Sequence, residues 1–216
     1  MKYRNRADAG RQLAGHLTHY GDADAIVYAL PRGGVPVAVE VARTLRIGVQ
    51  LLFVRKLGVP WQPEVAFGAL GEHDVCVVNR RMVAELGLSA ERITEVQSAA
   101  RAQLERAQAA FGSNLQTPAP ALPGTAIVVD DGIATGATVQ AAIAVLRARG
   151  VATIVVAAPV ASRHAVRMLQ ADADDVVVPL QPADFHAVGQ YYRDFHQLSD
   201  DDVRACLADL RTPDRP

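Results

Sequence analysis

Six short apolar runs, spread along the chain, limit its fold more than any other feature of the sequence. Each run is apolar on successive residues instead of alternating with polar ones, as is typical of a strand buried on both faces. Helical patterns lie between most of the runs. This alternation predicts an α/β fold in which a doubly wound, mainly parallel sheet is covered by helices. The runs are AIVYAL (25–30), VQLLFV (49–54), DVCVVN (74–79), TAIVVD (125–130), TIVVAAPV (153–160) and DVVVPL (175–180).

Five helices are predicted from the spacing of apolar residues and from the residues that start each pattern. Ser89 and Ser199 each precede a helical pattern, and serine is a favoured N-cap. Apolar residues between Ile93 and Phe111 fall on one stripe of the longest pattern. We interpret residues 80–122 as a helical excursion within one domain that spans 1–216. The predicted helices cover 34–46, 89–111, 136–149, 162–171 and 199–210.

The composition argues against nucleic-acid and membrane partners. The chain has 216 residues, and its 22 Lys and Arg nearly balance its 23 Asp and Glu, so it carries no global basic field. No run approaches the length of a membrane-spanning helix, and the N-terminal residues lack the apolar core of a signal peptide. Cys76 and Cys206 have no metal-ligand or disulfide spacing, so we expect two buried cysteines in a cytoplasmic protein.

The first candidate site is the loop in ALPRGGVPVAV, which follows the first run and precedes a helix. Gly33 and Gly34 allow backbone N–H groups to approach an anion closely, and the helix start adds positive potential. Arg32 adds a guanidinium that binds phosphate with two hydrogen bonds. Taken alone, the loop could equally be an ordinary glycine turn beside a solvated arginine.

The second candidate site is the segment IVVDDGIATGAT, where a buried run ends in two adjacent carboxylates. Asp130 and Asp131 can accept hydrogen bonds from sugar hydroxyls or hold a metal-bound ligand. Thr135–Thr138 begins a helix, so its N–H groups and hydroxyls can surround a phosphate. The lysine and the spacing of a Walker A loop are absent, as is a G-x-G-x-x-G pattern. The alternative is a capped helix next to two solvated acids.

The third candidate site is FVRKLGVPWQPEVAFGAL, in which Arg55 and Lys56 follow an apolar run. These two cations could neutralise a ligand rich in phosphate, and Trp61 and Glu64 could lie on a loop that moves. The alternative is a pair of solvated basic residues at the end of a strand.

The segment IVVDDGIATGAT resembles the phosphoribosyl-diphosphate signature of type I phosphoribosyltransferases. The resemblance implies that the acids bind the ribose hydroxyls, that the Thr-Gly-x-Thr turn binds the 5′-phosphate, and that LPRGG and the two basic residues bind diphosphate. It also implies a fold with a small hood or insertion and a Mg²⁺ ion held by Asp130 and Asp131, mainly through ligand or water. Implied catalytic residues are Asp130, Asp131, Arg55 and Lys56. Implied binding residues are Asp130, Asp131, Gly132, Ile133, Ala134, Thr135, Gly136, Ala137 and Thr138 for phosphoribosyl diphosphate and Arg32, Gly33, Gly34, Arg55 and Lys56 for diphosphate.

The segment PLQPADFHAVGQYYRDF is rich in aromatic residues and is similar to the purine-facing segment of hypoxanthine-guanine phosphoribosyltransferases. It implies a hood-like segment over 179–216, with Phe185 and Tyr191 as candidates for stacking on a planar base. Packing under the terminal helix is the alternative. Ala134, however, takes the place of an aspartate in the signature of 6-oxopurine enzymes and instead resembles the adenine and orotate enzymes. The acceptor therefore stays open.

The resemblance implies an enzyme that moves the 5-phosphoribosyl group from phosphoribosyl diphosphate to a nitrogenous base with release of diphosphate. Such a reaction would belong to nucleotide salvage and nucleoside metabolism, and a homodimer is one expected assembly. The first alternative is a sensor that binds phosphoribosyl diphosphate without chemistry. The second is a phosphatase or kinase that uses Asp130, although the usual lysine of phosphoryl transfer is absent from the segment.

Overall fold

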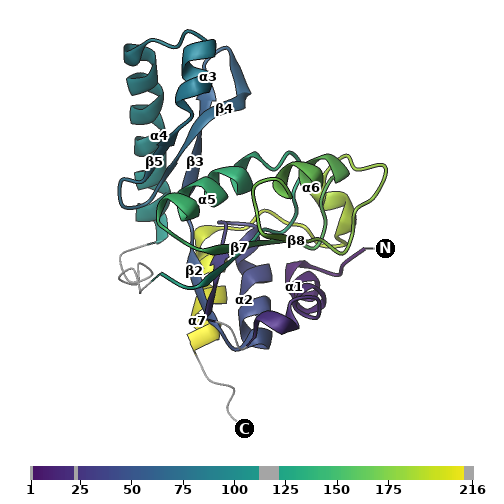
Figure 1. Cartoon of the computed structure of the whole chain (residues 1–216). Helices are drawn as coiled ribbons and strands as arrows, with labels where there is room; N and C mark the ends of the chain where they lie inside the picture. Colours follow the sequence, from purple (N-terminus) through teal and green to yellow (C-terminus); the bar gives the residue numbers. More distant parts are fainter. Residues whose placement is uncertain (1, 22–23, 112–121, 212–216) are drawn as a thin grey trace.

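A five-stranded parallel sheet forms the centre of the molecule, as the apolar runs predict (Figure 1). The computed structural model describes residues 2–21, 24–111 and 122–211. The strand order is β2-β1-β6-β7-β8, and each neighbouring pair is parallel. The strands are β1 (Ala25–Ala29), β2 (Gly48–Leu51), β6 (Thr125–Val129), β7 (Thr153–Ala157) and β8 (Asp175–Val177).

Helices cover both faces of this sheet, which confirms the doubly wound α/β fold. Alternate residues of the central strands face opposite sides, so that Val27 packs with the α2 layer and Tyr28 packs with the α5 layer. Figure 1 shows α5 and α6 above the sheet and α1, α2 and α7 below it. The helices are α1 (Arg6–Ala14), α2 (Gly34–Leu45), α5 (Ala137–Ala148), α6 (Arg163–Leu169) and α7 (Asp200–Arg211), with short 3-10 helices η1 (Thr18–Tyr20) and η3 (Val188–Tyr191).

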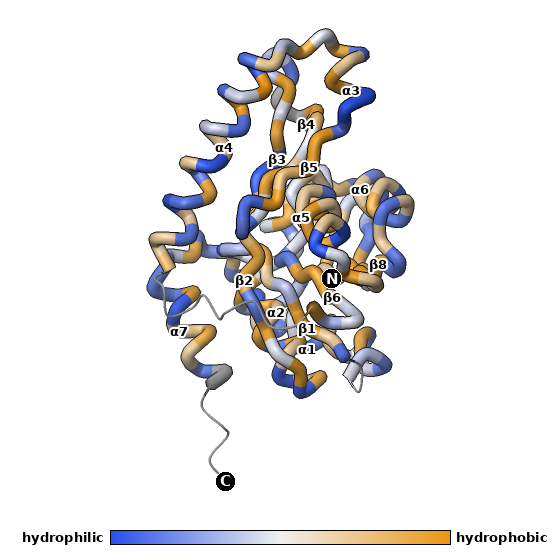
Figure 2. The backbone as a smooth tube through the Cα atoms, turned by 60° about the vertical axis from the view of Figure 1, so that its left-hand side comes forward, coloured by the Kyte–Doolittle hydropathy of each residue, from blue (hydrophilic) through white to orange (hydrophobic). Residues whose placement is uncertain are grey.

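A second, antiparallel sheet projects from one end of the molecule together with two helices (Figures 1 and 2). The run at 74–79 was expected in the parallel sheet, and that expectation is wrong. The chain instead turns at Pro60 and Trp61 into a hairpin, and the run pairs antiparallel with the second strand of that hairpin. This unit consists of β3 (Val54–Val59), β4 (Gln62–Gly71), β5 (Cys76–Val78), α3 (Arg80–Glu85) and α4 (Ala90–Phe111).

The exposure of Cys76 corrects a second expectation. Cys76 lies on β5, one of the two edge strands of the small sheet, and is exposed, while Cys206 on α7 is only half-buried. The Gln97 side-chain amide donates to the Cys76 Sγ at 3.3 Å. Burial, together with nearby acids led by Asp202, raises the pKa of the Cys206 thiol. The apolar run here belongs to a short strand of the small sheet and not to a central strand covered on both faces, so its cysteine is not buried.

The predicted helix starts are confirmed. The Arg92 N–H donates to the Ser89 Oγ, and Ser199 exchanges hydrogen bonds with Asp202 in a capping box.

Residues 112–121 of the predicted excursion lie outside the described residues. Within the described part of the chain, no helix is both long enough and apolar enough to cross a membrane.

The strand order places a topological switch between β1 and β6. The chain leaves β1 toward β2 on one side and later returns to β6 on the other side. The loops that follow β1 and β6 therefore diverge at the carboxyl edge of the sheet and leave a crevice between them. Two of the three candidate sites, 30–34 and 130–138, lie in these loops.

Candidate functional site

The two loops at the switch point are in direct contact through glycines. A Cβ on Gly33 would lie 2.2 Å from the Asp131 Oδ2, and a Cβ on Gly34 would lie 2.5 Å from the Val129 carbonyl oxygen. Neither position accepts a side chain without movement of its neighbours. The loop formed by Arg32, Gly33 and Gly34 (the RGG loop), in which the Pro31–Arg32 peptide bond is cis, is thus packed against Asp130 and Asp131 (the acid pair).

Arg6 is the cation that the acid pair requires. Its Nε donates to the Asp131 Oδ2 at 2.7 Å, and both side chains are about nine-tenths buried, with 9% and 12% exposed. The Asp131 N–H donates to the Asp130 Oδ1 at 2.9 Å, and the Tyr192 hydroxyl donates to the Asp131 carbonyl at 2.5 Å. The pair is therefore fixed by one guanidinium, one amide and one phenol.

Burial acts on the two aspartates unequally. Desolvation and the charge of Asp131 raise the pKa of Asp130 well above its ordinary value. Desolvation also raises the pKa of Asp131, but the hydrogen bond and charge of Arg6 oppose that rise. Burial and the nearby Asp131 likewise raise the pKa of the Tyr192 phenol, so Tyr192 remains a hydrogen-bond donor. Arg6 therefore favours the ionised form of Asp131 relative to that of Asp130, and Asp130 has the higher proton affinity of the two.

Sequence reasoning missed Arg6, because 125 positions separate it from Asp131. Asn5 caps α1 by accepting from the Asp8 N–H, and this places Arg6 in the first turn of that helix. The Arg6 guanidinium also donates to the His196 carbonyl and lies 3.9 Å from the ring centroid of Phe195. The sequence around Arg6, NRADAG, contains no pattern that distinguishes this arginine from one exposed to solvent.

The predicted phosphate turn lies at the start of α5. Gly136 has φ +82°, a left-handed conformation that favours glycine, and it precedes the first helical residue, Ala137. Ser162 donates to the Ala134 carbonyl at 2.7 Å, and the Ile133 N–H donates to the Val160 carbonyl. These contacts hold the loop against the segment after β7, while Thr135–Thr138 presents N–H groups that have no partner within the helix.

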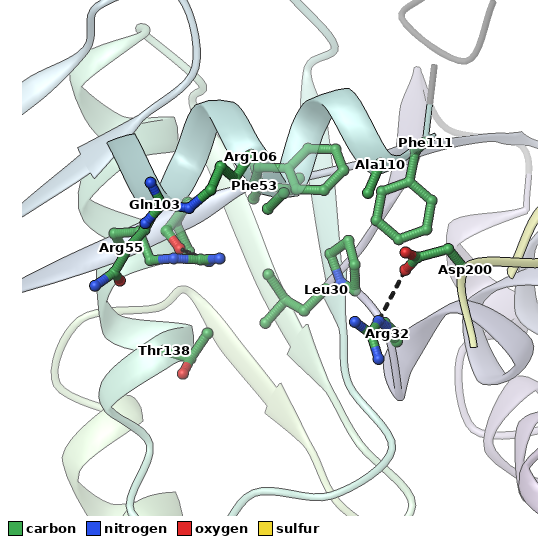
Figure 3. A pocket seen from close by; sticks show the side chains of 14 residues that line it. Leu30, Arg32, Phe53, Arg55, Gln103, Arg106, Ala110, Phe111, Thr138 and Asp200 are labelled. Carbon is green, nitrogen blue, oxygen red and sulfur yellow. Dashed lines mark hydrogen bonds and ion pairs between the residues drawn. The ribbon is translucent and has the colours of Figure 1, made fainter. Parts of the chain in front are cut away.

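A cavity of about 380 Å³ lies beside this turn and the RGG loop (Figure 3). Arg32, Arg55 and Thr138 line it, so the structure brings three predicted binding residues together. Burial lowers the pKa of Arg55, whose guanidinium donates to the Val54 carbonyl. Lys56 is the next residue of β3 and so faces the opposite side of the strand, and it does not line this cavity.

Arg32 is attached to the start of α7. Its Nε lies 2.9 Å from the Asp200 Oδ1, and its Nη1 donates to the Leu198 carbonyl at 3.1 Å. Figure 3 shows this ion pair at one end of the cavity, with Arg55 and Thr138 at the other. The α7 segment therefore positions the one charged side chain of the RGG loop.

A second cavity, of about 430 Å³, lies on the other side of Arg32. It is bordered by Arg6, Gly33, Asp131 and Phe195, so it reaches one member of the acid pair, Asp131. The predicted base-stacking residues lie elsewhere. Phe185 and Tyr191 stack on each other, with centroids 5.7 Å apart and planes at 15°, and line neither cavity.

The two other residues of the third segment lie on the β3–β4 hairpin. Trp61 is at its turn and is 62% exposed. Glu64 lies within β4, and its side chain is outside the described part of the structure. Trp61 lines neither of the two cavities.

The two aspartates at the switch point suit a magnesium ion that is coordinated mainly by the bound ligand. Asp130 and Asp131 are adjacent carboxylates, and the described residues contain no group of three or more acidic, histidine or cysteine side chains arranged for a metal. Mg²⁺ suits such a site, because it retains water and commonly binds through one or two carboxylates plus substrate phosphates.

Comparison with known proteins agrees with this geometry. The family model described as the phosphoribosyl transferase domain matches residues 78–196. Two curated proteins from Mycobacterium tuberculosis strains CDC 1551 / Oshkosh and ATCC 25618 / H37Rv, both provisionally named phosphoribosyl transferases, are 46% identical over 203 residues. That match covers 94% of this chain and 46% of the relatives, so the chain spans about half their length. The crystal structure of the TT1426 protein from Thermus thermophilus is similar with TM-score 0.89 and 38% identity, and the match covers 97% of this chain and 99% of that one.

Proposed function

The chain belongs to the phosphoribosyl transferase domain family, and on this premise we propose that it transfers the 5-phosphoribosyl group of phosphoribosyl diphosphate to a nitrogenous acceptor. The observation that carries the proposal is the contact between Gly33 and Asp131 at the switch point. It joins a loop suited to diphosphate with acids suited to ribose hydroxyls. A ligand with both groups on neighbouring atoms needs these two features side by side.

The proposed ligand would lie across the mouth of the crevice. Thr135–Thr138 would bind the 5′-phosphate through N–H groups and hydroxyls, since a helix N-terminus favours anions. Asp130 and Asp131 would accept hydrogen bonds from the ribose hydroxyls. Arg32 and Arg55, which share one cavity, would receive the diphosphate. Lys56 would require a movement of the β3–β4 hairpin to join them.

Displacement of diphosphate from C1 would proceed through a transition state with oxocarbenium character. The chain would lower its energy mainly by holding both phosphate ends and by neutralising the leaving group. Asp131, paired with Arg6, would place carboxylate oxygens beside the developing positive charge on the sugar. Mg²⁺ bound by the ligand and the two aspartates would neutralise diphosphate oxygens.

The cavity that borders Asp131 and Phe195 is the proposed acceptor site. It borders Asp131 and shares Arg32 with the first cavity, so a nucleophile bound there would lie near both the proposed ribose and diphosphate sites. Phe195 borders this cavity, held between the Tyr192 ring, with ring centroids 5.0 Å apart, and the Arg6 guanidinium, and it would give an acceptor an apolar contact. Phe185 and Tyr191 remain candidates for contacts with a larger acceptor. A base acceptor would give a nucleotide, which is the basis for a proposed role in nucleotide salvage in the cytoplasm.

The test is diphosphate release from phosphoribosyl diphosphate and Mg²⁺ in the presence of a panel of purine and pyrimidine bases. We expect release with at least one base, and loss of release in the Asp130→Asn/Asp131→Asn variant with its circular dichroism spectrum unchanged. Asp201→Asn, which removes an exposed acid of α7, is the matched control. Full activity in the double variant would refute the site assignment. Binding without release across the panel would instead favour the sensor.

A further inference from the structure

We propose that Arg106 of α4, assisted by Gln103 one turn earlier, binds the diphosphate group from the side opposite the RGG loop. Both residues belong to the segment 80–122, for which the sequence indicated only a helical excursion. The inference rests on the proposed function, since it names a further residue for the same ligand. It adds a third guanidinium to a site expected to hold two.

The face of α4 that borders the cavity is continuous. Gln103, Arg106, Ala107, Ala110 and Phe111 all line the cavity, and their spacing of three, one, three and one is that of one helical stripe. The two alanines leave space between the helix and the RGG loop. Arg106 and Gln103 are therefore the polar groups that α4 presents to that space. Figure 3 shows them at the same end of the cavity as Arg55.

The charges around the cavity are unbalanced. Arg32, Arg55 and Arg106 contribute three guanidinium groups, while Asp200 contributes the one carboxylate among the lining residues. Asp200 is already paired with Arg32. Within the described residues, neither Arg55 nor Arg106 has a carboxylate partner. Two guanidinium groups without an acidic partner on one cavity favour an anionic ligand with several oxygens.

The other arginines of α4 do have carboxylate partners, so within the described part of this helix the lack of one is particular to Arg106. Arg92 pairs with Glu95 at 2.7 Å on the same helix, and Arg101 pairs with Asp74. The positions three and four residues from Arg106 hold Gln103, alanines and no acid, so no neighbour on the helix surface can neutralise it.

The packing of α4 fixes where Arg106 is presented. Leu104 and Phe111, at the border of this stripe, are buried, with 5% and 6% exposed. The Phe111 ring lies 5.5 Å from the ring of Phe53, which directly precedes β3. The helix is thus held beside the same strand that carries Arg55. Diphosphate between Arg55 and Arg106 would be bound by two elements of the projecting unit and by the RGG loop of the central sheet.

The experiment is calorimetric titration with three separate probes: Mg·phosphoribosyl diphosphate, inorganic diphosphate and ribose 5-phosphate. Arg106→Gln should weaken binding of both diphosphate-containing probes about 10-fold, because it removes a charge-assisted hydrogen bond. It should leave the affinity for ribose 5-phosphate unchanged. Arg106→Lys should recover part of the loss, and Arg92→Gln on the same helix should match the wild type.

Three results would overturn the inference. Equal affinity of wild type and Arg106→Gln for inorganic diphosphate would show that Arg106 does not contact it. Weakened binding of ribose 5-phosphate alone would assign Arg106 to the other end of the ligand. A wild-type protein that binds none of the probes would instead remove the proposed function and the inference with it. A thermal melt of each variant separates loss of a contact from loss of the fold.

Discussion

Replacing Arg6 with methionine tests how the acid pair is tolerated inside the protein. The substitution keeps an unbranched apolar side chain but removes the guanidinium that lies 2.7 Å from the Asp131 Oδ2. Both side chains are about nine-tenths buried, so solvent weakens this ion pair much less than it weakens an ion pair at the surface. Breaking a buried pair by removing one partner costs about 3–5 kcal/mol. Proton uptake by the aspartates would reduce that cost, so we expect a loss of about 3 kcal/mol in the free energy of unfolding.

The assay is urea unfolding followed by far-ultraviolet circular dichroism at pH 7.5, arranged as a double-mutant cycle. Arg6 also contacts the His196 carbonyl and the Phe195 ring. Measuring Arg6→Met with and without Asp131→Asn separates the energy of the ion pair from the energy of these other contacts. Arg6→Met should cost much less in the Asp131→Asn background. Arg4→Met is the control, because Arg4 is 72% exposed and its pair with Asp8 should be worth about 0.5 kcal/mol.

Two outcomes would refute this reasoning. If Arg6→Met costs no more than Arg4→Met, the buried pair does not stabilise the fold. If Arg6→Met costs the same with and without the Asp131 carboxylate, the loss comes from the Phe195 and His196 contacts and not from the charge.

The remaining predictions concern the same acids and their neighbours. Gly33→Ala should destabilise the fold by about 1–3 kcal/mol and weaken binding of phosphoribosyl diphosphate, because its Cβ would lie 2.2 Å from the Asp131 Oδ2. Gly48→Ala has open space and serves as control in both the urea titration and the calorimetry. Tyr192→Phe should cost about 1–2 kcal/mol by removing the buried donor to the Asp131 carbonyl, while Tyr191→Phe, whose hydroxyl is at the surface, should cost less; matching thermal shifts would contradict this. The raised pKa values of Asp130 and Asp131 mean that the folded state holds protons more tightly. Their contribution to stability is therefore complete below the ordinary aspartate pKa of 3.8 and is lost as the pH rises through the raised values. Asp130→Asn should reduce this decrease in stability with rising pH, and it should unfold at a higher urea concentration than the wild type at pH 7.5. An unchanged dependence of stability on pH would contradict the raised pKa of Asp130.

The central sheet was predictable because its signal is local. Runs such as 125–129 and 153–157 are apolar on every residue after the first, and only a strand covered on both faces tolerates that pattern. The glycine pair at 33–34 and the acid pair at 130–131 then follow strands whose carboxyl ends meet at one edge. Their contact is a consequence of the parallel order, which the alternation of strands and helices indicates.

The remaining parts of the site depend on contacts that no local pattern encodes. The hairpin over 54–71 contains Gly58 and Pro60, residues that usually mark a loop, and its pairing depends on the partner strand. Arg6 reaches Asp131 only because α1 packs against α2 beside the sheet. Arg106 resembles any other arginine of a polar helix until the fold places α4 over the RGG loop. Charged side chains far apart in sequence are recognisable as a site only after tertiary packing is known.

The central claim is that the acid pair and the RGG loop together bind phosphoribosyl diphosphate. The direct measurement is the dissociation constant of Mg·phosphoribosyl diphosphate for the wild-type protein and for Asp130→Asn/Asp131→Asn, determined by calorimetry at one pH and one salt concentration. We predict saturable binding to the wild type and an affinity at least about 100-fold lower in the variant, since two charge-assisted contacts are lost. Equal affinities, or no binding to the wild type, would contradict the account.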